Sequence, residues 1–311
     1  MSVLPNPDYL NHPRFKTAAD RVNGDTAKAA LTQFLPAFHR TYVDWLTSSP
    51  PDLAARIGEG DEALRALQQC GFAQLTIDGA AKAELVALCA PLLAPLEARL
   101  SAFQGKPKFR DMNVALDGAD SATIYRLVEE MFGDLSVFDT VSAYVRRPLK
   151  LKKLFVQLNN ATETAARYGV IEQDGLPRLK SDYWHIDSDV WPCVKVIIYL
   201  NRVTLEQGPL RYVVGSHRAP PDFETVVRKT NDTLKLPADQ FLALPEEFRM
   251  HALFGPFLSG AEPQIEALLA QETAISGEAG DLILFDTNGV HRGGFVRSQD
   301  RRILQCLFQA A

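Results

Sequence analysis

Short apolar runs separated by turns, without an alternating β-α-β rhythm, predict a mainly β fold with flanking α-helices. The runs recur through the second half of the chain, at residues 151–159, 194–200, 210–214, 281–286 and 302–309. The most economical arrangement of such strands is a double-stranded β-helix, also called a jelly roll or cupin-like barrel. We therefore expect an antiparallel barrel with helices packed outside it.

Residues 1–60 are expected to form a helical N-terminal extension, followed by the barrel domain at residues 61–311. Apolar side chains recur at helical spacing between Leu31 and Trp45, and Ser48-Ser49-Pro50-Pro51 then interrupts the chain. The apolar stripe needs a partner surface, which either the barrel or a second subunit could supply. A monomer and a homodimer are both compatible with this pattern.

The start of the barrel domain predicts one strand and several helices. A short helix is expected to begin at Asp61 and to end at Gly71, and residues 72–77 alternate apolar and polar side chains as a strand does. Apolar residues at helical spacing predict further helices around residues 85–92, 124–133 and 135–145. These helices are expected to back the sheet.

A long segment, residues 219–277, separates two of the expected strands. It contains Pro-rich and helical stretches, and we expect the sheet to resume at residues 281–286. Long insertions between core strands usually lie on the surface. We therefore expect this insertion to form a lid or a wall of the substrate site.

Composition is that of a globular enzyme with 311 residues, 46% hydrophobic residues and a net charge of −5. The acidic balance argues against nucleic acid as a partner. We found no apolar run of the ~20 residues that span a bilayer and no signal pattern at the N-terminus, so no membrane partner is expected. The four Cys form no C-x-x-C pair, which favours reduced thiols and a cytoplasmic location.

The stretch from Tyr183 to Trp191 carries the main chemical motif. His185 and Asp187 are two residues apart, so on a strand they point to the same face and can reach one metal ion. His291 is the candidate third ligand. Two His and one carboxylate on one face are typical of non-haem Fe(II) oxygenases. The alternative for His185 is a core histidine satisfied by a neighbouring carboxylate.

The sequence resembles the phytanoyl-CoA dioxygenase family of Fe(II)/2-oxoglutarate-dependent oxygenases, from about Ala66 to the C-terminus. The resemblance is carried, in the family's order, by His185-x-Asp187, Gly208-Pro209-Leu210, Gly215-Ser216-His217, His291 and Arg302. One departure is Val214, where the family more often has Pro before Gly-Ser-His. These motifs are specific for the superfamily and poorly specific for substrate.

The resemblance implies three cofactors, namely Fe(II), 2-oxoglutarate and O2, with His185, Asp187 and His291 as catalytic metal ligands. A guanidinium pairs well with the distal carboxylate of 2-oxoglutarate. Arg301 and Arg302 are neighbours on one expected strand, so only one of them can enter the barrel. The family spacing from His291 selects Arg302, and Arg301 is the alternative.

Other residues are candidates for the cofactor pocket. Trp191 resembles an aromatic residue of related ectoine hydroxylases and is expected to line the pocket or the core. Polar side chains on strands that could face the interior are candidates for hydrogen bonds to 2-oxoglutarate: Gln157, Lys195 and Tyr199, with Asn159 as a further one. An anionic substrate group is favoured by Arg211, Arg292 and Arg297, although solvated surface charges would give the same pattern.

The expected function is a cytoplasmic dioxygenase that hydroxylates an unactivated C–H bond of a small or medium-sized metabolite, with release of succinate and CO2. The intact carboxylate at Asp187 favours hydroxylation, because related halogenases have a small residue there. Desaturation or cyclisation could use the same site. Two other classes stay open. One is a catalytically silent jelly-roll binding protein, and the other is a cupin-like metalloenzyme that does not use 2-oxoglutarate.

Overall fold

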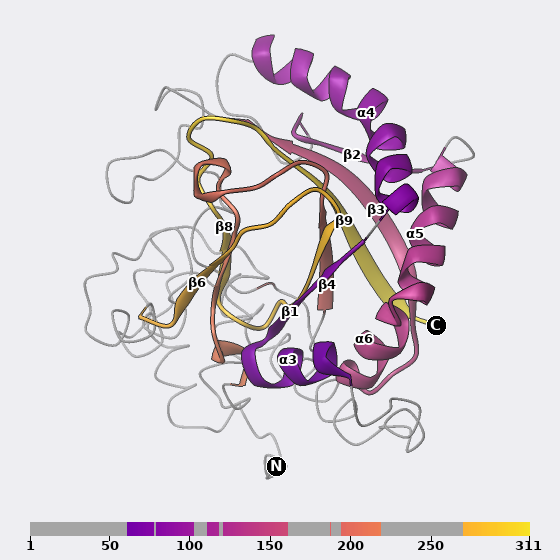
Figure 1. Cartoon of the computed structure of the whole chain (residues 1–311), viewed down its shortest axis with the longest axis vertical. Coiled ribbons are helices and arrows are strands. Elements are labelled where there is room, and N and C mark those ends of the chain that lie inside the picture. The colour runs from indigo at the N-terminus through magenta and orange to yellow at the C-terminus, as the bar shows by residue number, and fades with distance from the viewer. Residues whose placement is uncertain are drawn as a thin grey trace, which may run out of the picture.

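The computed structural model describes residues 61–77, 79–102, 111–117, 121–160, 187, 194–218 and 270–311. In these ranges two antiparallel sheets lie opposite each other, with helices on one outer side (Figure 1). The predicted mainly β fold with flanking helices is confirmed. The predicted N-terminal extension, most of the predicted insertion, His185 and Trp191 lie outside the described residues.

The larger sheet has six strands, and every pair of neighbours in it is antiparallel. Its strands, in spatial order, are β1 (Phe72–Thr76), β7 (Asp281–Asp286), β4 (Val194–Tyr199), β9 (Arg301–Ala310), β3 (Leu149–Asn159) and β2 (Asn113–Ala115). Neighbours in this order are distant in sequence, so the sheet forms through long-range pairing. β9 lies between β3 and β4, and its inner face lines a cavity between the two sheets.

The smaller sheet has three strands, in the order β6 (Glu272–Ile275), β5 (Leu210–Val213) and β8 (His291–Gly293). β6 falls inside the segment predicted as an insertion. It pairs with β5 from Leu210 opposite Ile275 to Val213 opposite Glu272. The barrel therefore resumes at Glu272, earlier than predicted. This strand was missed because it has only four residues, of which two are polar, and so has a weak hydrophobic pattern.

Within the described ranges, six helical segments accompany the strands: α3 (Glu62–Cys70), α4 (Gly79–Ala102), α5 (Ala122–Asp134), α6 (Val137–Val145) and the 3-10 turns η4 (Leu205–Gln207) and η5 (Ser216–Arg218). α3 begins and ends where the sequence predicts. The Asp61 carboxylate accepts a hydrogen bond from the Leu64 amide, and Gly71 ends the helix with φ 89°. A side chain at Gly71 would also collide with Tyr212 and His217.

α4 is one continuous helix, although it contains Pro91 and Pro95. By length and composition alone it could cross a membrane, although no membrane span is predicted from the apolar runs of the sequence. Part of it is buried inside the protein, through Leu85, Cys89, Leu93, Leu96 and Leu100. The apolar side chains of one face thus contribute to the core.

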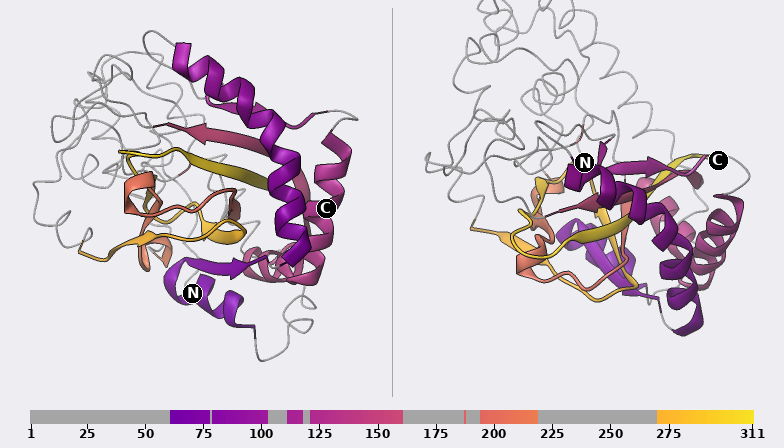
Figure 2. Two further views of the ribbon diagram at one scale, coloured as in Figure 1. Left: turned by 45° about the horizontal axis from the view of Figure 1, so that its top comes forward. Right: turned by 90° about the horizontal axis from the view of Figure 1, so that it is seen from above.

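Side chains of the large sheet alternate between two hydrophobic cores. On β4, Val194, Val196 and Ile198 point outward into a core shared with α4, α5 and α6. Ile197 and Tyr199 point inward, into a smaller core between the two sheets. Figure 2 shows the helices on the outer side of the large sheet and the small sheet opposite. The central strand β4 is therefore packed on both faces.

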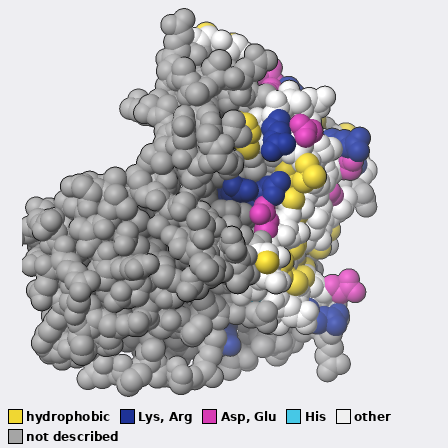
Figure 3. All heavy atoms as spheres, turned by 90° about the vertical axis from the view of Figure 1, so that its left-hand side faces the viewer, with side chains coloured by type: hydrophobic (Ala, Val, Ile, Leu, Met, Phe, Trp, Pro, Cys, Tyr) yellow, Lys and Arg dark blue, Asp and Glu magenta, His cyan; other side chains and the backbone are white. Residues whose placement is uncertain are grey.

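The described surface mixes charges of both signs. On the face in Figure 3, basic and acidic side chains of the described part lie next to one another. Exposed ion pairs such as Arg126–Glu130 at 4.0 Å and Arg202–Glu278 at 3.1 Å have the same character. Pairs of this kind contribute about 0–1 kcal/mol to stability. These exposed ion pairs therefore do not indicate a functional site, and the region between the two sheets is the better candidate.

Candidate active site

The imidazole of His291 is held in one orientation at the start of β8. Its Nδ1 lies 2.8 Å from the carbonyl oxygen of Gly289. A carbonyl only accepts hydrogen bonds, so Nδ1 carries the proton and the lone pair is on Nε2. Metal-binding His residues commonly have this arrangement, with one nitrogen donating to a backbone carbonyl. His291 is 4% exposed, so Nε2 faces the protein interior.

Asp187 lies opposite this lone pair. Its Oδ1 is 3.9 Å from His291 Nε2, and its backbone amide donates to the Thr287 carbonyl at 3.0 Å. Protein nitrogen and oxygen ligands bind a transition metal at about 2.0–2.2 Å, so one ion between the two atoms can contact both. No third His, Cys, Asp or Glu completes this pair within the described ranges. His185, which the sequence pairs with Asp187 as a metal ligand, is not among the described residues.

The turn that carries His291 rests on buried polar side chains that the sequence analysis missed. Asp286, the last residue of β7, accepts from the Tyr144 hydroxyl at 2.6 Å and from the Asn288 backbone amide at 2.8 Å. The Tyr212 hydroxyl donates to the Asp286 carbonyl at 2.9 Å, and the Tyr212 ring stacks on the His291 ring. Burial raises the pKa of Tyr212 and of Tyr144 well above the usual range, so both hydroxyls stay protonated donors. An Asp at the end of an apolar strand and two residues before Asn-Gly was the available signal.

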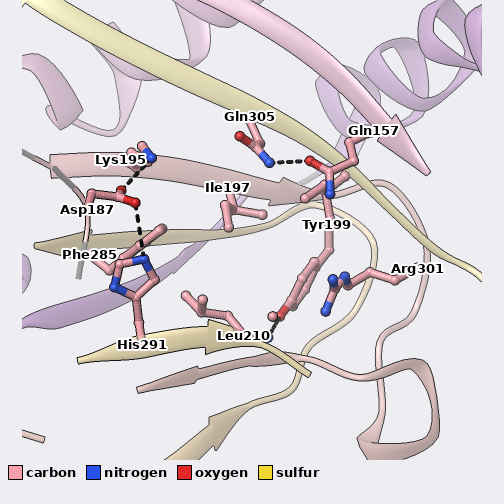
Figure 4. Close-up of a pocket in the computed structure, with 12 residues that line it drawn as sticks. Gln157, Asp187, Lys195, Ile197, Tyr199, Leu210, Phe285, His291, Arg301 and Gln305 are labelled. Atoms are coloured by element: carbon pink, nitrogen blue, oxygen red, sulfur yellow. Dashed lines mark hydrogen bonds and ion pairs between the residues drawn. The ribbon is translucent and has the colours of Figure 1, made fainter. Parts of the chain in front are cut away.

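A cavity of about 210 Å³ lies between the two sheets, with Asp187 and His291 at one end (Figure 4). Its apolar lining consists of Ile197, Leu210, Phe285 and Ile303. Its polar lining consists of Gln157, Asp187, Lys195, Tyr199, His291, Arg301 and Gln305, and Gly293 completes the described wall. Three predicted cofactor residues, Gln157, Lys195 and Tyr199, therefore face the cavity.

The assignment of the two neighbouring arginines is corrected by the structure. Arg301 lines the cavity and is 5% exposed, whereas Arg302 lies on the outer face of β9. Arg302 forms an ion pair with Glu97 of α4, with 2.7 Å between Nη2 and Oε1. The register explains the difference, because Arg302 pairs with Leu158 of the helix-side core and Arg301 pairs with Asn159. Arg302 does not enter the barrel.

Arg301 is anchored at the end of the cavity away from Asp187 and His291. Its Nη1 donates to the carbonyl of Gly208 and, at 3.3 Å, to that of Gly294. Both glycines are needed there, because a side chain on either one would overlap the backbone of the other. The close approach of these two loops therefore builds a cradle for the guanidinium.

Tyr199 joins the two sheets through its hydroxyl. The hydroxyl donates to the Ile275 carbonyl at 2.7 Å and accepts from the Leu210 amide at 3.2 Å. Burial raises its pKa to about 12, so the proton stays on the oxygen at neutral pH. The hydroxyl is thus occupied by backbone groups of β5 and β6, although the ring faces the cavity.

Amide side chains form a chain along the wall opposite the small sheet. Gln305 donates to the Gln157 side-chain oxygen, and Gln157 donates to the Asn159 side-chain oxygen at 2.8 Å. Gln305 was missed by the sequence analysis. Its signal was its position two residues after Ile303 and four after Arg301, which puts all three on one face of a strand.

The remaining predicted arginines lie elsewhere. Arg211 and Arg292 both approach Glu272, the latter at 3.7 Å, on strands of the small sheet. Arg297 is exposed. None of the three is among the residues that line the described cavity.

Comparisons with known proteins agree with the architecture. A family model described as Phytanoyl-CoA dioxygenase (PhyH) matches residues 76–304. No curated protein matches the sequence.

Solved structures with a similar fold are only distantly related in sequence. EctD from S. alaskensis in its apoform has 18% identity and a TM-score of 0.48, over 79% of this chain and 75% of that one. The epimerase SnoN in complex with Fe3+, alpha ketoglutarate and nogalamycin RO has 15% identity and a TM-score of 0.48, over 80% and 82%. EvdMO1 has 15% identity and a TM-score of 0.44, over 80% of this chain and 49% of that chain. Likenesses at this level say nothing about the reaction of this chain.

Proposed function

The chain belongs to the phytanoyl-CoA dioxygenase family of Fe(II)/2-oxoglutarate-dependent enzymes, and from this premise we propose that it is a hydroxylase. Fe(II), 2-oxoglutarate and O2 are the cofactors of this family. The proposed reaction converts an unactivated C–H bond of a small or medium-sized metabolite to an alcohol, and 2-oxoglutarate to succinate and CO2. The cavity of about 210 Å³ suits ligands of modest size.

The observation that carries the proposal is the placement of metal-binding and carboxylate-binding groups at opposite ends of one cavity. The Asp187 carboxylate and the His291 lone pair lie at one end, and the Arg301 guanidinium lies at the other. Carboxylate and imidazole suit a ferrous ion, and a guanidinium suits a carboxylate. A dicarboxylate cofactor that chelates the metal through one end needs a cation for its other end.

Each side chain has a definable task in this reaction. Bound Fe(II), together with 2-oxoglutarate and O2, would supply the oxidation. The protein would orient the substrate and exclude water and stray reductants. Asp187, His291 and His185 would hold the metal, and Arg301 would hold the distal carboxylate of 2-oxoglutarate. Ile197, Leu210, Phe285 and Ile303 keep water away from the reacting atoms. Arg301 replaces Arg302 in this role because it faces the cavity.

Hydroxylation is favoured over halogenation by Asp187. Its carboxylate lies 3.9 Å from His291 Nε2 and would bind the metal where a halide would need to bind. The apolar wall and the amides of Gln157 and Gln305 favour a substrate with both apolar and hydrogen-bonding parts.

The test is an anaerobic titration of metal-free protein with Fe(II) and then 2-oxoglutarate, followed by the weak visible charge-transfer band of the chelate. We expect the band in the wild type and its loss in His185→Ala and His291→Ala. Ser142→Ala is the control, because Ser142 is not among the residues that line the described cavity. Candidate substrates are then screened by stimulated succinate release, and the product is identified by its mass, which rises by one oxygen atom for hydroxylation.

Each alternative class gives a different outcome. Iron binding without a band on addition of 2-oxoglutarate would favour the cupin-like metalloenzyme. Absence of iron binding would favour a silent jelly-roll binding protein. A product without added oxygen would contradict hydroxylation but not the dependence on Fe(II) and 2-oxoglutarate.

A further inference from the structure

The two oxygens of the Asp187 carboxylate point to different partners. Oδ1 faces His291 Nε2 at 3.9 Å, and Oδ2 accepts from the Lys195 ammonium at 2.5 Å (Figure 4). Both side chains are largely buried, with exposed fractions of 18% for Asp187 and 26% for Lys195. The ion pair is therefore partly shielded from solvent, where a charge-assisted hydrogen bond is strong.

The fold places Lys195 there by strand alternation. Lys195 is the second residue of β4 and shares the inward face with Ile197 and Tyr199. It pairs across the sheet with Phe285, whose ring packs edge-on against the His291 ring at 5.1 Å. The lysine, the carboxylate and the imidazole thus belong to one packed group on adjacent strands.

We propose that Lys195 is a positioning residue that limits Asp187 to donating one oxygen to the metal and lowers the metal affinity of the site. This inference rests on the proposed function. An ammonium group has three donors and no acceptor, so it can hold Oδ2 but cannot itself bind a metal. With Oδ2 held, Oδ1 is the oxygen left to face the ion.

The restriction bears on the number of open coordination positions. A carboxylate that donates both oxygens takes two positions on a six-coordinate ion, and one that donates a single oxygen takes one. The second position is one that a chelating 2-oxoglutarate or O2 requires. Lys195 therefore favours cofactor binding by keeping Asp187 from closing the site.

The positive charge of Lys195 is expected to lower the affinity of the site for a metal ion. Lys195 and a divalent ion would share one carboxylate, and two cations at such short range repel each other. Removal of the lysine charge relieves this repulsion and also removes the contact between the Lys195 ammonium and Asp187 Oδ2 from the metal-free protein. Both effects make metal binding more favourable, so the metal affinity should rise.

The experiment compares Lys195→Met, which keeps the length and loses the charge, with Lys195→Arg, which keeps the charge. Lys153→Met is the matched control, because Lys153 pairs with Asp117 at 3.7 Å on β3 and does not line the cavity. Calorimetry measures the affinity of each metal-free protein for Co(II), and then the affinity of each Co(II)-loaded protein for 2-oxoglutarate. The visible spectrum of Co(II) reports coordination, and circular dichroism reports folding.

We expect Lys195→Met to bind Co(II) about 10-fold tighter and the loaded variant to bind 2-oxoglutarate about 10-fold more weakly, with a changed Co(II) spectrum. Lys195→Arg and Lys153→Met should stay within about twofold of the wild type. An unchanged or weaker Co(II) affinity of folded Lys195→Met would overturn the inference alone. A wild type that binds no Co(II) would overturn the proposed function itself.

Discussion

On β9, Arg301, Ile303 and Gln305 face the cavity, whereas Leu304 and Cys306 face the helices. The outer residues are packed against α4 and α5 and take part in one large hydrophobic core. The inner residues border a cavity and carry polar groups. One face of the strand thus contributes to the hydrophobic core and the other face lines the cavity. Successive residues of the strand alternate between the two faces.

The largest difference between the two faces should appear in stability. Leu304→Ala should lower the free energy of unfolding by about 3 kcal/mol, because Leu304 is fully buried in the helix-side core. Ile303→Ala should cost about half as much, because one side of Ile303 already borders the cavity. Urea denaturation measures both values. Equal losses would mean that the two faces are packed equally well.

The neighbouring arginines should differ in cofactor binding. Arg301→Ala should weaken 2-oxoglutarate binding to the metal-loaded protein about 100-fold, about 2.7 kcal/mol, through loss of a charged hydrogen-bond partner. Arg302→Ala should stay within about twofold, because Arg302 pairs with Glu97 on the outer face. Calorimetric titration with 2-oxoglutarate measures both. A larger effect at Arg302 would refute the assignment of the two faces.

Tyr199 tests whether a residue on the inner face can be structural. Tyr199→Phe should cost about 1–2 kcal/mol in stability, because the Ile275 carbonyl and the Leu210 amide lose their partner. The affinity for 2-oxoglutarate should stay within about twofold. A large loss of affinity with unchanged stability would instead make this hydroxyl a cofactor ligand.

The pH dependence of the same substitution follows from the raised pKa. Burial raises the pKa of Tyr199 from 10.0 to about 12, so the unfolded chain releases this proton first as pH rises. The stability that the buried hydroxyl contributes is complete below pH 10 and is lost between pH 10 and 12. The stability difference between wild type and Tyr199→Phe should therefore narrow across that window, as measured by urea denaturation at a series of pH values.

Thiol reactivity should show the smallest effect. Cys306 on the outer face of β9 and Cys89 of α4 are buried, and burial raises the pKa of Cys89 to about 12 and that of Cys306 well above its usual range. Cys70 is only partly buried. In a Cys193→Ser background, a thiol reagent at pH 8 should modify Cys70 in the native protein and all three thiols after unfolding. Rapid labelling of Cys306 in the native protein would contradict the packing of the outer face.

The wrong choice between Arg301 and Arg302 shows where sequence reasoning stops. β9 is apolar at 303, 304 and 306–308, so hydrophobic alternation could not tell which face was inward. Gln305 was the available clue, because an amide between apolar residues of a strand suggests a polar cavity on its side. Gln305 and Arg301 are four residues apart and therefore lie on the same face of the strand, which selects Arg301.

The sequence alone determined the local features of this protein. The helix α3 from its Asp61 cap to Gly71, most of the strands, and the membership in the dioxygenase family were all readable from residue patterns. These depend on neighbours within a few positions or on motifs kept in order. The tertiary structure decided that β6 belongs to the barrel, that Arg301 faces the cavity, and that Lys195 holds Asp187. Those features arise from contacts between residues far apart in the chain, since the helices that cover one face of the sheet determine which side chains are left to line the other.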